Sequence, residues 1–203
     1  MTQIQAAAGA GRPDRAPAAP GAFSSQRLER VFNQCFSAHW RTRLAGGASE
    51  PYYQPAAGAG DFHLLYYRSD YFASALHETA HWCIAGDRRR QLADFGYWYA
   101  PDGRSPEQQR DFEAVEARPQ ALEWLFSLAC GYRFHVSADN LGAPDDVNGG
   151  NLAFKQQVLV QALAWQERGL PQRAQRFFDA LALDFGSGLR VRELALDLSG
   201  ITA

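Results

Sequence analysis

The sequence predicts an α+β fold: one mostly helical domain with a small β-sheet beside a central helix. Apolar residues recur at helical spacing in about five segments, whereas strand-like runs occur in only about three. These helices and strands do not follow the regular alternation of β-α-β units. With 203 residues, 46% of them hydrophobic and 21% charged, the chain has the size and composition of a single globular domain.

The first 22 residues differ in composition from the rest of the chain. Residues 1–22 are dominated by Ala, Gly and Pro, and they lack the apolar centre of a signal peptide. Such a segment cannot bury enough apolar surface to order itself, so we expect a disordered extension. We assign residues 23–203 to the single folded domain.

The expected helices are defined by apolar residues that recur every three or four positions. They cover residues 24–44, 71–85, 106–130, 152–168 and 171–183. Capping residues precede the first three, namely Ser24 or Ser25, Ser69 or Asp70, and Ser105. Gly86 should end the second helix in a left-handed conformation. Pro119 lacks an N–H group, so we expect a kink or a restart of the third helix just beyond Glu116.

Three short runs are rich in strand-forming residues. They are residues 61–68, 94–99 and 132–137. Residues 46–60 contain two prolines and four glycines, which predicts a loop. The basic run at residues 88–90 is short, and we interpret it as a solvated helix end.

Charge and cysteine content narrow the class of protein. The net charge of −2 gives no indication of affinity for nucleic acid or for a membrane. No apolar run approaches the roughly 18 residues that a membrane-spanning helix needs. The three cysteines are far apart and lie in apolar segments, which favours buried free thiols in a reducing cytoplasm.

The second expected helix carries the feature on which the functional prediction depends. His77 and His81 are four residues apart, so both imidazoles should lie on one helix face, one turn apart. Neutral histidine is a ligand for zinc and for iron. Glu78 is placed to reach a water in an open coordination position, which makes it the candidate catalytic residue. The motif is HExxH.

Chance is a poor explanation of this motif. With 5 His and 9 Glu in 203 residues, the pattern is expected only rarely, roughly 0.005 times in a chain of this composition. The expected strand just before the motif helix is the local order found in zincin-like metal sites. We therefore predict a zincin-like arrangement, with the sheet beside the motif helix.

A third metal ligand should come from a neighbouring helix. Glu113 and Glu116 lie three residues apart on one face of the third expected helix, and both can point towards the histidines. We prefer Glu116, because small residues follow it and would allow close packing against the motif helix. Glu113 remains the alternative at this stage.

Four separated blocks resemble a known family. In chain order they read ALHETAHWCIAG, DFGYWYAPDGR, FEAVEARPQA and VSADNL. In these blocks the chain resembles the bacterial elongation factor P hydroxylases, and the resemblance covers about residues 24–184. It implies a cytoplasmic monooxygenase that uses O₂ to hydroxylate the β-lysylated lysine of elongation factor P. By the same resemblance, His77, His81 and Glu116 would hold Fe(II).

Two other functions stay open on the residues alone. Two imidazoles and a carboxylate also form the site of a zinc metallopeptidase, in which Glu78 would act as general base. A metal-binding adaptor without catalysis is the third possibility.

A long cationic substrate side chain should require acidic or aromatic groups near the metal. Candidates within the family-like blocks are Asp94, Tyr97, Trp98, Tyr99, Asp102 and Asp139. Each of them could instead serve a turn or the core.

Overall fold

The computed structural model describes residues 23–96, 104–137 and 150–202. The expected disordered extension and the candidates Tyr97, Trp98, Tyr99, Asp102 and Asp139 lie outside these residues. The described part of the chain forms five α-helices and a three-stranded sheet. The predicted α+β class, mostly helical with a small sheet, is confirmed.

The sheet has the strand order β1-β3-β2. Strand β1 (Thr42–Ala48) runs parallel to the central strand β3 (His63–Arg68), and β2 (Tyr52–Gln54) runs antiparallel to it. Only β3 was predicted at its place. The expected extension of the first helix to residue 44 is therefore wrong, and the expected loop at residues 46–60 is wrong where residues 46–48 belong to β1 and residues 52–54 form β2.

The first helix, α1, covers Ser25–Phe36 and ends well before the predicted position. The backbone at Arg41 turns with φ 46°, and the chain then enters β1. Two adjacent glycines made this strand look like a loop in the sequence. Gly46 is required there, because a Cβ atom on it would lie 2.5 Å from the Tyr67 hydroxyl of β3. This close approach of two strands is a tertiary contact that local propensity does not encode.

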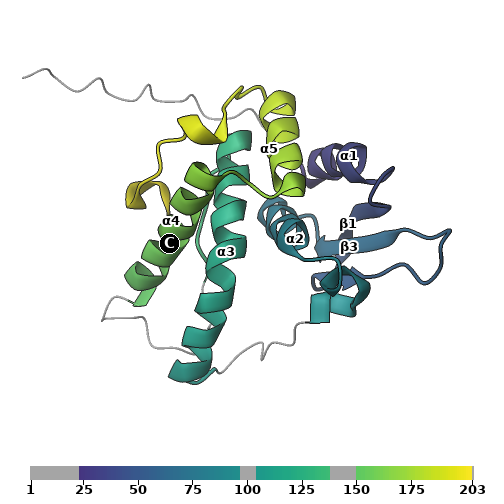
Figure 1. The fold of residues 1–203 in the computed structure, drawn as a ribbon, viewed down its shortest axis with the longest axis horizontal. Coiled ribbons are helices and arrows are strands. Elements are labelled where there is room, and N and C mark those ends of the chain that lie inside the picture. The colour runs from purple at the N-terminus through teal and green to yellow at the C-terminus, as the bar shows by residue number, and fades with distance from the viewer. Residues whose placement is uncertain (1–22, 97–103, 138–149, 203) are drawn as a thin grey trace, which may run out of the picture.

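The motif helix, α2, covers Phe72–Ile84, as predicted, and follows β3 directly. Its predicted ends are wrong in detail. Tyr71 stands at the N-cap without a side-chain hydrogen bond, and Ala85 ends the helix in an extended conformation, so Gly86 is not the terminator. Figure 1 shows α2 at the centre of the molecule, with the sheet on one side and α3 on the other. The predicted position of the sheet beside this helix is confirmed.

Helix α3 (Pro106–Cys130) is one continuous helix that contains Pro119. The expected restart after Glu116 does not occur. Its start matches the prediction, because Ser105 accepts a hydrogen bond from the Gln108 N–H in a capping box and Pro106 takes the first position. Gly131, with φ 72°, ends the helix in a left-handed conformation.

Two further helices pack against α3. They are α4 (Gly150–Arg168) and α5 (Gln172–Asp184), close to the predicted ranges. The remaining elements are short 3-10 turns, η1 (Arg89–Gln91), η2 (Ala93–Gly96), η3 (Val191–Glu193) and η4 (Leu198–Gly200).

Two predicted strands do not form within the described residues. Asp94 and Phe95, at the start of the expected strand 94–99, have φ of 47° and 56° and belong to η2. The hydrogen bond from the Tyr53 N–H to the Asp94 carboxylate holds this turn against β2. In the segment 132–137, only His135 pairs, in an isolated bridge to Thr202.

The core beside α2 is aromatic. Trp82 is fully buried, and its ring lies 4.7 Å from that of Phe36 and 5.2 Å from that of Phe32, both on α1. Phe177 of α5 packs on the same two α1 rings. These contacts fix one side of the motif helix against α1 and α5, and the other side faces α3.

Candidate metal centre

The side of α2 that faces α3 carries the two motif histidines. The Nε2 atoms of His77 and His81 lie 3.1 Å apart, as expected for residues one turn apart on a helix. Their side chains are 26% and 11% exposed, so both rings are mostly withdrawn from solvent. The predicted common face of the two imidazoles is confirmed.

Helix α3 supplies a buried carboxylate opposite these rings. Glu116 Oε1 lies 3.3 Å from His81 Nε2, and Glu116 Oε2 lies 3.5 Å from His77 Nε2. The side chain of Glu116 is only 4% exposed. Glu113, the alternative third ligand, is half-buried and accepts a hydrogen bond of 3.0 Å from Gln109 on its own helix. The structure thus brings Glu116 to the histidines.

A second carboxylate on α3 was not predicted from the sequence. Glu123 lies two helical turns after Glu116, and its Oε2 is 2.8 Å from His77 Nδ1. This contact places a ring proton on Nδ1 and leaves Nε2 facing Glu116 and His81, where it could bind a metal ion once its own proton is lost. A signal for it existed, since Glu123 stands alone among apolar residues in a buried stretch of helix.

The three ligand atoms have the spacing that a metal ion requires. His77, His81 and Glu116 each offer one atom, and these atoms lie within 4.8 Å of one another. Bonds of about 2.1 Å to one metal at angles of about 90–110° place ligand atoms about 3.0–3.4 Å apart. The two Nε2 atoms lie 3.1 Å apart, and each has a different oxygen of Glu116 near it, Oε1 at 3.3 Å from His81 and Oε2 at 3.5 Å from His77, so the donor atoms lie close to this spacing. Nitrogen and carboxylate donors suit zinc and iron alike.

The charges around the histidines also favour a cation. Burial alone would lower the pKa of His77, but the hydrogen bond and charge of Glu123, with the charges of Glu116 and Glu78, raise the pKa to about 10. Burial would raise the pKa of Glu116, but the charges and hydrogen bond of the two histidines lower the pKa to about 2. Three carboxylates around two imidazoles therefore form an electronegative site, which a divalent metal ion would neutralise.

Glu78 and Asp94 lie at the edge of this group. Burial raises the pKa of the Glu78 carboxyl, the charges of the two histidines oppose that shift, and the charge of Asp94 adds to it. Asp94 is the substrate candidate that falls within the described residues. One of its oxygens accepts the Tyr53 N–H at 2.8 Å, so its role includes holding β2 to η2.

The last turn of the motif helix is fixed by a half-buried arginine of α5. Arg173 Nη2 lies within hydrogen-bond distance of the carbonyl oxygens of Trp82, Cys83 and Ala85, at 3.1, 3.1 and 2.5 Å. Carbonyl groups at a helix C-terminus lack partners within the helix, and a cation there is favourable. The contact holds the turn that follows His81.

These observations define the class of protein. It is a helical α+β domain in which an HExxH helix and a neighbouring glutamate form a candidate metal centre. The chain belongs to the elongation factor P hydroxylase family, since a family model of that description matches residues 31–193. The family resemblance noted from the sequence blocks is thereby confirmed, and it agrees with the expected enzyme class of oxidoreductase.

A curated relative supports the same assignment. Over 152 residues the chain is 51% identical to the elongation factor P lysine hydroxylase of Haemophilus influenzae. The alignment covers 74% of this chain and 83% of that protein.

The sequence predicted no membrane-spanning helix, and the structure allows this to be checked for the described residues. Among the described residues, no helix combines the length and the apolar character needed to cross a membrane.

Proposed function

We propose that this protein is a metal-dependent hydroxylase that acts on the β-lysylated lysine of elongation factor P, in the cytoplasm and with O₂ as oxidant. One observation supports this most directly. In a chain of this family, two histidines and a buried glutamate from different helices converge with the spacing of metal ligands. The relative from Haemophilus influenzae carries the corresponding name.

Fe(II) is the metal we propose, held by His77, His81 and Glu116. Two imidazoles and one carboxylate leave coordination positions open, and iron bound in this way supplies the activation of O₂. The zinc peptidase with Glu78 as general base uses the same donors, but family membership does not favour it. Iron rather than zinc is therefore the metal to test first.

The proposed reaction replaces a C–H bond of the modified lysine by C–OH. One oxygen atom of O₂ enters the product, and the other leaves as water with two protons and two electrons from an external reductant. The protein side chains have simpler tasks. Glu123 keeps the proton of His77 on Nδ1, and the packing of α2 against α3 excludes bulk water from Glu116. Glu78, which follows His77 on α2, would hold a hydrogen bond to a water or to the substrate at this site.

The cationic side chain of the substrate should find acidic partners near the metal. Asp94 is the candidate whose position the structure describes, and its electrostatic influence reaches Glu78. Tyr97, Asp102 and Asp139 remain proposals from the sequence.

The experiment is a mass measurement on elongation factor P that carries the β-lysyl group. Protein loaded with Fe(II), with a reductant in excess, should add the mass of one oxygen atom in air and none under nitrogen. The zinc-loaded protein should produce neither hydroxylation nor cleavage. A mass gain that is undiminished under nitrogen would contradict the oxygenase, and cleavage of the factor by the zinc form would support the peptidase.

A further inference from the structure

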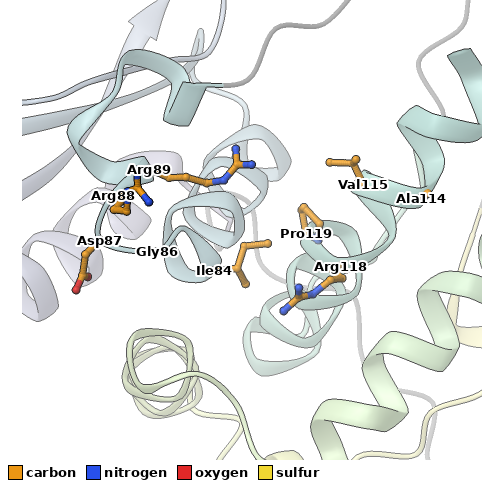
Figure 2. Close-up of a pocket in the computed structure, with 9 residues that line it drawn as sticks. All are labelled: Ile84, Gly86, Asp87, Arg88, Arg89, Ala114, Val115, Arg118 and Pro119. Carbon is orange, nitrogen blue, oxygen red and sulfur yellow. The ribbon is translucent and has the colours of Figure 1, made fainter.

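A hollow of about 650 Å³ opens between the loop after α2 and the middle of α3. We call it the arginine pocket; its described lining residues are Ile84, Gly86, Asp87, Arg88, Arg89, Ala114, Val115, Arg118 and Pro119. Figure 2 shows Ile84 pointing towards Val115 and Pro119, with Arg89 and Arg118 on opposite sides of these apolar residues. An apolar floor with a charged rim is the usual anatomy of a protein interface.

The rim carries an excess of positive charge. Arg88, Arg89 and Arg118 are all exposed, and they come from two different elements. Asp87, the acid among the lining residues, is held by a salt bridge of 2.6 Å to Arg90. Figure 2 shows the Asp87 carboxylate pointing away from the other lining side chains. Arg89 donates a hydrogen bond of 3.2 Å to the Phe95 carbonyl. Guanidinium groups at one opening repel one another, and an acidic partner would lessen that repulsion.

The apolar floor of the arginine pocket would be stabilised by an apolar side chain of a partner that covers it. Val115 is 40% exposed although it lies in the middle of a long helix. Ile84, Ala114 and Pro119 complete the apolar surface around it. Covering such surface is favourable by about 25 cal/mol per Å² of apolar area removed from water.

The pocket adjoins the metal centre. Contacts pair His77 with Glu123 and His81 with Glu116, so α2 and α3 run antiparallel along this edge. Ile84 lies three residues beyond His81 on the same face of the helix, and Val115 directly precedes Glu116. A helical turn advances about 5 Å. A partner seated in the pocket would therefore lie about one helical turn along α2 from His81, one of the residues proposed to hold the metal.

We propose that the arginine pocket docks an acidic segment of the protein substrate, with an apolar side chain of that segment on the floor. The inference rests on the proposed function, since the docked partner is the protein whose lysine the centre hydroxylates. A protein segment fits better than a small anion. The arginines are exposed on the rim, whereas a small anion would need charged or polar donors buried around it.

The test is a charge reversal on both walls of the pocket, Arg88→Glu with Arg118→Glu. The matched control is Arg168→Glu with Arg192→Glu, which changes the net charge equally at exposed positions outside the pocket. We expect the KM for elongation factor P to rise at least about 10-fold in the first variant, with kcat within about 2-fold, and the control to stay near wild type. Raising the salt from about 0.05 to about 0.3 M should raise the wild-type KM and remove most of the difference between the variants.

Several results would overturn the docking site. These are equal KM values for the two double variants, a loss of kcat at unchanged KM, or potent competition by inorganic phosphate that the pocket variant abolishes. The last result would identify a small-anion site instead. If wild-type protein fails to hydroxylate elongation factor P, the proposed function fails. Calorimetric titration then measures the affinity of elongation factor P for the wild type and both double variants, which tests the docking site without hydroxylation. Equal affinities would refute the docking site.

Discussion

The two sides of helix α2 have opposite characters. The side towards α1 and α5 carries Trp82, which is fully buried among aromatic rings. The side towards α3 carries His77 and His81, which face the buried carboxylates Glu116 and Glu123. One helix of 13 residues thus separates an apolar core from a group of charges.

The difference shows how this fold holds a polar site in its interior. Burying ionised groups costs several kcal/mol per ion unless they are paired, so the side towards α3 contributes little net stability without a cation. Aromatic burial on the other side offsets that cost and fixes the helix against its neighbours. Changes on the α3 side should therefore act on metal and activity, and changes on the aromatic side should act on folding.

The largest effect should come from removing a ligand. His77→Ala, His81→Ala and Glu116→Ala should each reduce bound metal from about one equivalent per chain to near zero and abolish hydroxylation, because two protein ligands hold a metal little better than solvent does. Metal analysis of the purified variants measures this, and circular dichroism should show that they remain folded. Glu113→Ala is the matched control and should keep its metal. A filled site in Glu116→Ala with an empty one in Glu113→Ala would reverse the assignment.

The substitution Trp82→Ala tests how much the aromatic side of α2 contributes to stability. Because this ring is fully buried, we expect the free energy of unfolding to fall by about 3–5 kcal/mol. Urea denaturation of the metal-free protein measures the loss without a contribution from metal. Leu183→Ala, at a helix position that is 83% exposed, should change the stability by less than about 0.5 kcal/mol. An equally small loss in both variants would show that the aromatic side does not stabilise the fold as we infer.

A smaller effect is expected at Glu123, which reaches the metal only through His77. Glu123→Gln keeps the size of the side chain but removes its charge, so the Nδ1 proton of His77 is held less firmly. Metal affinity should fall by about 10- to 100-fold, the usual range for partners of metal ligands. Competition with a chelator of known affinity measures it. Unchanged affinity would reduce Glu123 to a packing role.

The substitution Glu78→Gln distinguishes a hydroxylase from a peptidase. It should have the smallest effect on metal binding of the changes considered. For a hydroxylase, Glu78→Gln should keep its iron and retain hydroxylation with a loss of about 10- to 100-fold. For a peptidase, the same change should abolish cleavage, because it removes the general base that takes the proton from the attacking water. Metal content and the mass of elongation factor P are measured on the same sample. Complete loss of hydroxylation with iron still bound would assign Glu78 a direct part in the reaction.

The local sequence determined the motif helix, the start of helix α3 and the family, although it did not reveal most of the sheet. The spacing of His77 and His81 predicted their common face, because helical geometry needs only neighbouring residues. The capping residue Ser105 was predicted for the same reason. Four sequence blocks were enough to indicate the family.

Tertiary structure decided what depends on residues far apart in the chain. The sequence favoured Glu116 over Glu113, but its contact with the histidines depends on the register in which α3 packs against α2. The contact of Glu123 with His77 depends on that same register. Strand β1 escaped prediction because its parallel pairing with β3 is non-local, and one of its glycines, Gly46, permits a close approach to Tyr67. The period of a helix or strand determines on which face a side chain lies. Only the packing of one element against another decides which side chains of the two come into contact.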